Sequence, residues 1–258
     1  MKKKTIIIIV IGGLVLIAAL WGASRHLGWF EGENPVQVQE DTFVYDETIP
    51  VDLENKTKVL DLVILDMSGS MMYLHKPVID GFNTLLEGLK QANAKYSGTQ
   101  EHYLTLCLFN SEYTGFAHYN TPIDSVQPLS GNIYRPRDLT PLYDAVGMSI
   151  AHLMDITDTL SEYSVLVTVI SDGFENASQY YTKGMVSHLI NMLSDSGWSF
   201  AYFGTGEEML REAENINIDS VHYFELSDTG VNNMMKMDEN SRVSKYRAID
   251  SLRRRNNQ

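Results

Sequence analysis

The chain is 258 residues long, enough for one large domain or two small ones, and 44% of its residues are hydrophobic, as in ordinary globular proteins. Its formal net charge is −13, and residues 34–258 alone carry 16 Lys and Arg against 31 Asp and Glu. Such an acidic domain repels nucleic acid and anionic membrane at long range, so we expect no nucleic acid partner. The one cysteine, Cys107, excludes an intrachain disulfide, and its apolar neighbours predict a small buried residue rather than a nucleophile.

Residues 1–30 predict a membrane anchor. Three lysines follow Met1 and precede an apolar stretch of 18 residues, Thr5–Gly22, which is near the lower limit for a membrane-spanning helix. The lysines should keep the N-terminus in the cytoplasm, so we expect a single-pass protein of the cell membrane. The rest of the chain would then lie outside the cytoplasm, in the periplasm if the cell is Gram-negative. A cleaved signal peptide is the alternative, which the length of the apolar run and the poor cleavage site near Trp21 disfavour. Residues 31–56 are polar, acidic and interrupted by two prolines, which is typical of a spacer.

Strands and helices alternate after the spacer. A nearly continuous run of branched aliphatic residues ends at Asp66 and predicts a strand that is buried on both faces. Periodicity predicts further strands at 103–109, 115–119, 165–170, 199–203 and 221–226, and helices at 76–96, 142–158, 183–194, 207–215 and from about 231 onward. This order predicts an α/β fold of the Rossmann-like, doubly wound kind, with a mostly parallel six-stranded sheet and helices on both faces. We assign residues 57–245 to this domain and residues 246–258 to the end of the last helix and a tail.

Oxygen-bearing side chains stand after two of the predicted strands and before one of the predicted helices. Asp66, Ser68 and Ser70 stand at alternate positions where the first strand ends, Asp172 follows the strand at 165–170, and Thr140 precedes a helix. Taken singly, these residues could form turns and cap helices. Taken together, they supply the hard oxygen ligands that Mg²⁺ or Mn²⁺ prefers. They also lie where ligands bind in such a sheet, beyond the carboxyl ends of its strands.

Three segments carry a resemblance to a known family: Asp66-Met67-Ser68-Gly69-Ser70, Thr140-Pro141-Leu142-Tyr143-Asp144-Ala145 and Asp172-Gly173-Phe174-Glu175-Asn176-Ala177-Ser178. Together they resemble the metal-ion-dependent adhesion site of von Willebrand factor A (VWA) domains, in particular of the stand-alone bacterial members. The resemblance covers about residues 58–224, and all five site positions are intact.

The resemblance implies a role for each site residue. The hydroxyls of Ser68, Ser70 and Thr140 would bind the metal, and Asp66 and Asp172 would act mostly through bound waters. The metal would be a divalent cation, Mg²⁺ first, with Mn²⁺ or Ca²⁺ as alternatives. The partner would be a protein whose Asp or Glu carboxylate reaches the open position on the metal. Since the domain is acidic, we expect that carboxylate to stand alone on a neutral or basic surface.

The sequence also leaves other functions to consider. A scaffold subunit of an envelope or ATPase-linked assembly would use the same site, and the sequence does not separate it from an adhesion module. A metal-dependent phosphohydrolase with Asp66 as its nucleophile would need a second carboxylate two residues later, where Ser68 stands. We therefore expect no enzymatic activity. Tyr73, His75 and Asn176 are candidates for the rim that meets the partner, although Tyr73 and His75 also suit an ordinary surface at a helix start.

Overall fold

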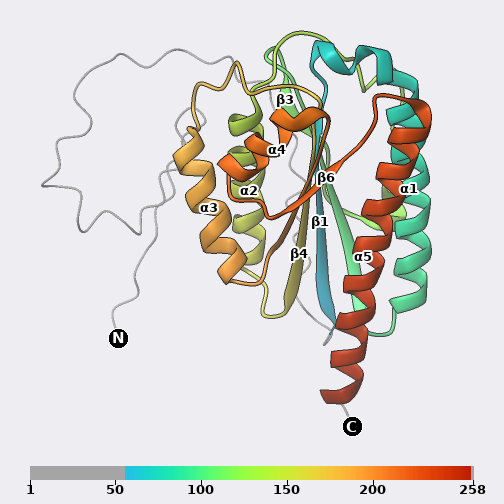
Figure 1. The fold of residues 1–258 in the computed structure, drawn as a ribbon. Coiled ribbons are helices and arrows are strands. Elements are labelled where there is room, and N and C mark those ends of the chain that lie inside the picture. The colour runs from blue at the N-terminus through green and yellow to red at the C-terminus, as the bar shows by residue number, and fades with distance from the viewer. Residues whose placement is uncertain (1–55, 257–258) are drawn as a thin grey trace, which may run out of the picture. The chain divides into compact units, whose positions relative to one another are not determined.

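The computed structural model describes residues 56–256, and Figure 1 shows the fold. The predicted anchor and most of the predicted spacer lie outside these residues. Within the described part of the chain, no helix is both long enough and apolar enough to cross a membrane.

The centre of the domain is a six-stranded sheet in the order β3-β2-β1-β4-β5-β6. All neighbouring strands run parallel except β3, which pairs antiparallel with β2. The prediction of a mostly parallel six-stranded sheet is therefore confirmed. The strands are β1 (Thr57–Asp66), β2 (Gln100–Phe109), β3 (Thr114–Pro122), β4 (Tyr163–Ile170), β5 (Ser199–Gly204) and β6 (Ser220–Tyr223).

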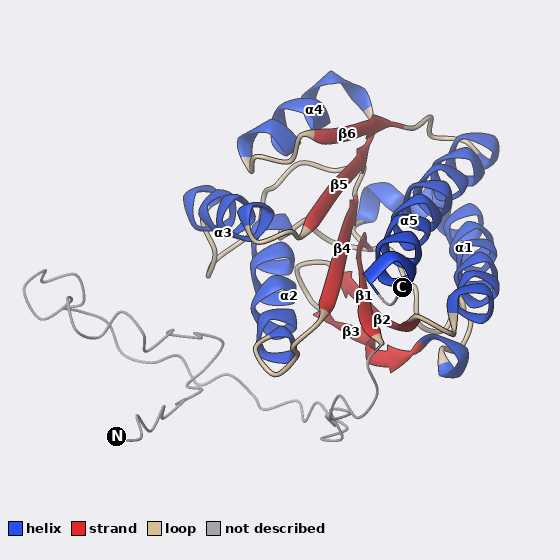
Figure 2. Cartoon of the chain, turned by 90° about the horizontal axis from the view of Figure 1, so that it is seen from below, coloured by secondary structure: helices blue, strands red, loops and turns tan. Residues whose placement is uncertain are grey.

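Helices cover both faces of the sheet (Figure 2). They are α1 (His75–Tyr96), α2 (Leu142–Thr157), α3 (Lys183–Asp195), α4 (Gly206–Asn215) and α5 (Asp228–Asn256). Alternate residues of β1 pack on opposite sides: Val63 belongs to the core beneath α1 and α5, and Leu62 to the core beneath α2 and α3. Because every residue of β1 is buried, the strand is apolar on both faces, apart from Asp61, and shows no alternation of polar and apolar residues between Val59 and Leu65. Cys107 is fully buried in β2, as its neighbours predict.

The element ends differ from the predicted ends in a few places. A short 3₁₀ helix, η3 (Gly69–Leu74), stands between β1 and α1, and another, η4 (Ile123–Ser125), follows β3. The last strand was predicted to reach residue 226 but ends at Tyr223. There the chain turns, and the Ser227 hydroxyl accepts a hydrogen bond from the Gly230 N–H (3.0 Å), which caps the start of α5. Helix α5 then continues without a break to Asn256.

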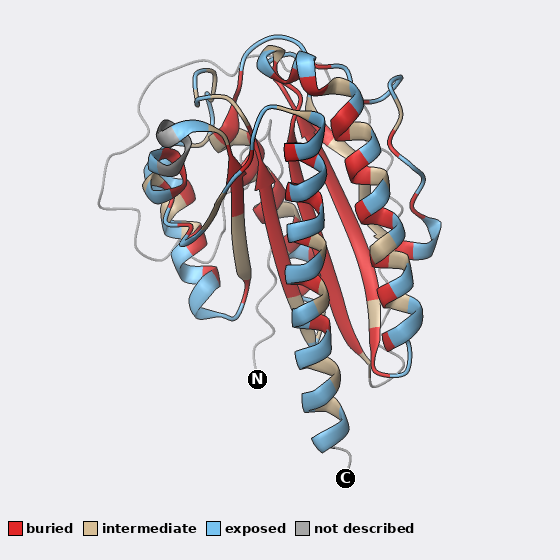
Figure 3. Cartoon of the chain, turned by 45° about the vertical axis from the view of Figure 1, so that its right-hand side comes forward, coloured by how far each residue is buried: buried red, intermediate tan, exposed pale blue. Residues whose placement is uncertain are grey.

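A buried polar network fastens α5 to the sheet. The Arg242 guanidinium, 1% exposed, pairs with Asp61 of β1 (Nη1 to Oδ1, 2.6 Å) and with Asp238 (Nε to Oδ2, 2.8 Å). The Tyr246 hydroxyl also donates to the Asp61 carboxylate at 2.8 Å. Burial disfavours the ionised form of Asp61, but Arg242 and these hydrogen bonds hold the pKa of Asp61 below its usual value. Figure 3 shows α5 lying against the buried strands of the sheet.

Candidate metal and partner-binding site

The site lies where the strand order changes direction. The strands β1 and β4 are parallel neighbours, with Leu65 opposite Ile170 at their carboxyl ends. The chain leaves β1 toward α1 on one face and leaves β4 toward α3 on the other (Figures 1 and 2). The two loops therefore lead to opposite faces of the sheet, and this switch point is where open α/β sheets bind ligands. Asp66 is the last residue of β1, and Asp172 is the second residue after β4.

The five predicted site residues converge at this point. The Ser70 hydroxyl donates to Asp172 Oδ1 at 2.6 Å, and the hydroxyl oxygens of Ser68 and Ser70 lie 3.1 Å apart. Gly173 shows how close the other groups are. A β-carbon at this glycine would lie 2.9 Å from Thr140 Oγ1, 3.4 Å from Ser70 Oγ and 3.6 Å from Asp66 Oδ2. Three loops thus bring two carboxylates and three hydroxyls around one small space.

The site has a buried floor and an exposed mouth. Asp66, Ser68 and Thr140 are buried, whereas Ser70 is exposed and Asp172 is intermediate. Burial raises the pKa of Asp66 to about 6, against the opposing effect of hydrogen bonds from Ser171 and Ser68. Burial also raises the pKa of Asp172. Within residues 56–256, no Lys or Arg forms an ion pair with either carboxylate. The donor set is therefore all oxygen, carries two carboxylates and suits a hard divalent cation.

Hydrogen bonds from the segment between β3 and α2 hold the first loop of the site, which follows β1. The Tyr134 hydroxyl donates to the Asp66 carbonyl at 2.8 Å. The Ser68 N–H donates to the Asp66 carboxylate at 2.6 Å, which fixes the direction of that side chain. The Gly69 N–H donates to the carbonyl of Asp138 at 2.9 Å. Asp138 has a left-handed backbone (φ 64°), which Asp tolerates better than most residues. The bonds to Tyr134 and Asp138 fix the position of the first loop relative to the segment that carries Thr140.

Two acidic side chains clamp the second and third loops together. The Glu175 carboxylate accepts hydrogen bonds from the N–H groups of Tyr143 (2.9 Å), Ala177 (2.9 Å) and Ser178 (2.7 Å) and from the Ser178 hydroxyl (2.6 Å). The Asp144 carboxylate accepts from three successive N–H groups, those of residues 179–181, at 2.7–2.9 Å. Both acids stand in the segments that carry the family resemblance, and they orient the loops that carry the donor oxygens.

The three rim candidates have different surroundings. Tyr73 is 92% exposed, at the end of the first loop. His75 is half-buried, and its Nε2 lies 2.9 Å from the carbonyl oxygen of Tyr134. Asn176 is exposed, but its side-chain oxygen accepts the Thr140 N–H at 2.8 Å. The contacts of His75 and Asn176 support the loops, and their role toward a partner stays a prediction.

Ser171 is a site residue that the sequence analysis did not identify. It is buried, and its hydroxyl donates to Asp66 Oδ2, the oxygen that Ser68 N–H leaves free. Its position directly before Asp172, at the end of a buried strand, was the signal that could have shown it. Ser171 and Ser68 therefore fix the Asp66 carboxylate together, each through a different oxygen.

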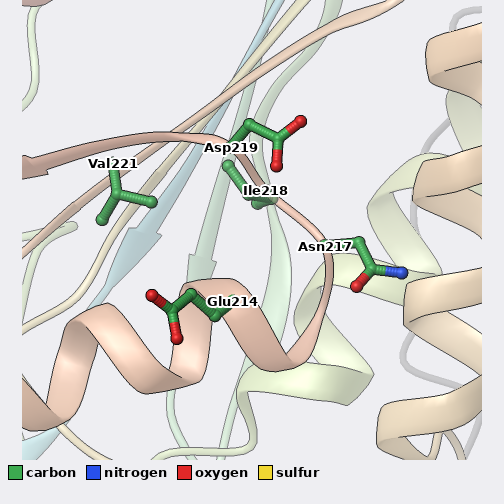
Figure 4. Close-up of a pocket in the computed structure, with 5 residues that line it drawn as sticks. All are labelled: Glu214, Asn217, Ile218, Asp219 and Val221. Carbon is green, nitrogen blue, oxygen red and sulfur yellow. The ribbon is translucent and has the colours of Figure 1, made fainter.

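A separate pocket lies at the other end of the sheet. It has a volume of about 350 Å³ and is lined by residues of α4, of β6 and of the turn that joins them, Glu214, Asn217, Ile218, Asp219 and Val221 (Figure 4). None of the five site residues lines it. Its lining holds neither a cation nor a nucleophile, so we assign it no role.

Comparisons with known proteins bear on the fold. No family model matches the sequence, and no curated protein matches it. Among solved structures, the chain is similar to the PilB minor pilin from Streptococcus sanguinis, with a TM-score of 0.54 and 9% identity over 75% of this chain and 63% of that one. It is also similar to the pilus adhesin SpaC from Lactobacillus rhamnosus GG in its open conformation, with a TM-score of 0.50 and 13% identity over 75% of this chain and 31% of that one. The matched region is thus less than two thirds of either neighbour. These likenesses show that the described domain shares its mixed α/β fold with a domain-sized part of two pilus proteins.

Proposed function

We propose that this protein is a membrane-anchored binding module of the VWA type. Its domain would bind a divalent metal, Mg²⁺ first, through Asp66, Ser68, Ser70, Thr140 and Asp172. Through that metal it would bind the Asp or Glu carboxylate of a partner protein outside the cytoplasm. The observation that carries the proposal is the convergence of these five oxygen-bearing side chains, from three loops, around Gly173.

The chemistry of the donor set supports the role of the metal. Mg²⁺ prefers six oxygen ligands and retains waters, so neutral hydroxyls and water would complete its shell here. The bound metal would supply a concentrated positive charge with a replaceable water. The residues of this chain hold the hydroxyls in place: Ser70 is oriented by Asp172, and Thr140 is oriented through the bond from its N–H to Asn176.

A binding role fits the site better than catalysis does. Ser68 stands where a phosphohydrolase of this fold would need its second carboxylate, and its N–H is used to orient Asp66. The fold shared with a minor pilin and a pilus adhesin supports a role in protein–protein interaction. A scaffold subunit of an envelope or ATPase-linked assembly would use the site in the same way. This alternative differs from the adhesion module in its partner and not in how the site binds.

Calorimetric titration of the full chain with Mg²⁺, Mn²⁺ and Ca²⁺ tests the proposal. The protein would be held in nanodiscs of zwitterionic lipid, because its N-terminal stretch is apolar and anionic lipid would itself bind the metals. We expect one saturable site that is lost in both Asp66→Ala and Asp172→Ala. Asp80→Ala removes an exposed carboxylate on α1 that pairs with Lys76, and it should bind metal normally. The proposal fails if the parent does not bind metal even with a glutamate-containing peptide present, or if both site variants still bind it.

A further inference from the structure

Large apolar side chains are exposed around the mouth of the proposed metal site. Among the described residues, thirteen large hydrophobic side chains are exposed, and seven of them stand in the four segments that join β1 to α1, β2 to β3, β3 to α2 and β4 to α3. One of the seven, Tyr180, stands close to the start of α3. We call the other six residues the apolar collar. They are Met72, Tyr73, Tyr113, Ile133, Leu139 and Phe174, and they are between 41% and 92% exposed.

Two hydrogen bonds join two of the loops that carry the collar. The Ser111 N–H donates to the Leu139 carbonyl at 3.0 Å, and the Leu139 N–H donates to the Ser111 hydroxyl at 3.1 Å. These bonds join the loop that carries Tyr113 to the loop that carries Thr140. Phe174 stands two residues after Asp172, in the loop between β4 and α3. The loops after β1, β2 and β4 leave the carboxyl edge of the sheet (Figure 1). The segment after β3 starts at the opposite edge, because β3 is antiparallel, but its later part returns to the site, where the Arg137 N–H donates to the Met67 carbonyl at 3.0 Å.

Ion pairs join some of the charged side chains among these loops. Arg137 pairs with Glu112 at 2.8 Å and with Asp138 at 3.4 Å. Arg137 offsets only one of these two carboxylates, so a divalent metal bound in the site would be the strongest positive charge near the collar. Single exposed hydrophobic residues are normal on a protein surface, but their concentration around one site marks an interaction surface.

We propose, on the basis of the proposed metal site, that the partner presents its carboxylate between large apolar side chains. The partner segment is an exposed Asp or Glu flanked by aromatic or aliphatic residues. The carboxylate binds the metal, and the flanking residues pack on the collar, where they exclude water from that bond. A protein fits this surface better than an anionic membrane does, because residues 34–258 carry 16 Lys and Arg against 31 Asp and Glu and repel anionic lipid.

Three synthetic peptides test the proposal against the full chain in zwitterionic nanodiscs with saturating Mg²⁺. The first carries Phe-Glu-Phe in a Gly-Ser background, the second Ser-Glu-Ser and the third Phe-Gln-Phe. We expect the first peptide to bind at least tenfold more tightly than either of the others. The double variant Tyr73→Ser/Phe174→Ser should bind the first peptide no better than the second peptide. The matched control Met185→Ser/Met237→Ser removes two exposed methionines from α3 and α5, and it should bind all three peptides as the parent does.

Metal titration of the same variants separates the two proposals. We expect Tyr73→Ser/Phe174→Ser to bind Mg²⁺ as tightly as the parent. If the parent binds metal but binds Phe-Glu-Phe and Ser-Glu-Ser equally, the collar has no role while the metal site stands. Equal binding of Phe-Glu-Phe and Phe-Gln-Phe would also overturn the proposal, since the carboxylate would then be unnecessary. Collar-dependent binding to vesicles that contain anionic lipid, stronger than binding to the first peptide, would identify the surface as a membrane contact instead.

Discussion

The Ser70 hydroxyl donates a 2.6 Å hydrogen bond to the Asp172 carboxylate, although the two residues are 102 positions apart in the chain. Ser70 follows β1 and Asp172 follows β4, and these strands are parallel neighbours in the sheet. The bond therefore reports the alignment of the two strands at their carboxyl ends. It also links three of the donor groups, because the Ser70 hydroxyl oxygen lies 3.1 Å from that of Ser68.

We expect Gly173→Ala to weaken metal binding about tenfold, the range seen when groups around a metal site are disturbed. The added methyl group would lie 2.9 Å from Thr140 Oγ1, closer than a carbon and an oxygen normally approach, so the Thr140 hydroxyl must move. Calorimetry with Mg²⁺ measures the affinity. Gly184→Ala is the control, because a methyl group there meets nothing within 4 Å, and it should leave metal affinity unchanged. Unchanged affinity in Gly173→Ala would show that Thr140 is not a ligand.

We expect Asp66→Asn to stabilise the metal-free protein at pH 7. Burial raises the pKa of Asp66 from 3.8 to about 6. Between these pH values the folded protein keeps a proton that the unfolded chain releases, so the free energy of unfolding falls as the pH rises. About two pK units correspond to roughly 3 kcal/mol at most, and an amide avoids this loss because it does not ionise.

Urea unfolding in the presence of a chelator, from pH 4 to pH 8, measures this effect. The variant should match the parent near pH 4 and exceed its free energy of unfolding by roughly 1–3 kcal/mol at pH 7. Adding Mg²⁺ should stabilise the parent but not the variant, since ligand binding stabilises only the protein that binds it. A difference that does not change with pH would contradict the raised pKa.

We expect Glu175→Gln to loosen the loops that carry Thr140 and Asp172. The Glu175 carboxylate accepts four hydrogen bonds, and an amide can accept with only one of its two head atoms, so at least one N–H would lose its partner. The loss should cost about 1–3 kcal/mol of stability and about tenfold or more in Mg²⁺ affinity. Thermal unfolding and calorimetry measure the two effects. Glu87→Gln, at an exposed residue of α1 with a 3.8 Å contact to Lys90, should change neither by a measurable amount.

We expect Arg242→Met to destabilise the domain by about 3–5 kcal/mol, because it leaves Asp61 and Asp238 buried without their cation. Denaturant unfolding measures the change. The triple variant Arg242→Met/Asp61→Asn/Asp238→Asn should recover part of the loss, since no uncompensated charge then remains. Arg254→Met removes an exposed arginine that pairs with Asp250, and it should leave the stability of the domain nearly unchanged. If Arg242→Met were as mild as Arg254→Met, α5 would not be held by the buried network.

Local patterns account for the parts of the structure that could be predicted. The aliphatic run before Asp66 predicted a buried strand, and alternating strands and helices predicted the parallel sheet, because side-chain periodicity depends only on nearby residues. The five candidate metal-binding residues were picked out by a similar local reading, since they stand where predicted strands end or where a predicted helix starts, and their role toward a metal stays a prediction. Ser171 was missed: its position directly before Asp172 places it near the site, but only the structure shows that its hydroxyl donates to Asp66.

Contacts between distant segments could not be read from the chain. Asp61 lies in the middle of the apolar run that predicted β1, and its partner Arg242 comes 181 residues later in a mostly polar helix. Nothing local indicates that these residues meet, nor that six exposed hydrophobic residues from four loops surround one site. The sequence by itself determined the strands, the helices and the donor oxygens at their ends, because periodicity and residue chemistry are local properties. Only the tertiary structure decided the strand order, the partners of the buried charges and the composition of the site's surroundings, because strand pairing and helix packing join residues far apart in the chain.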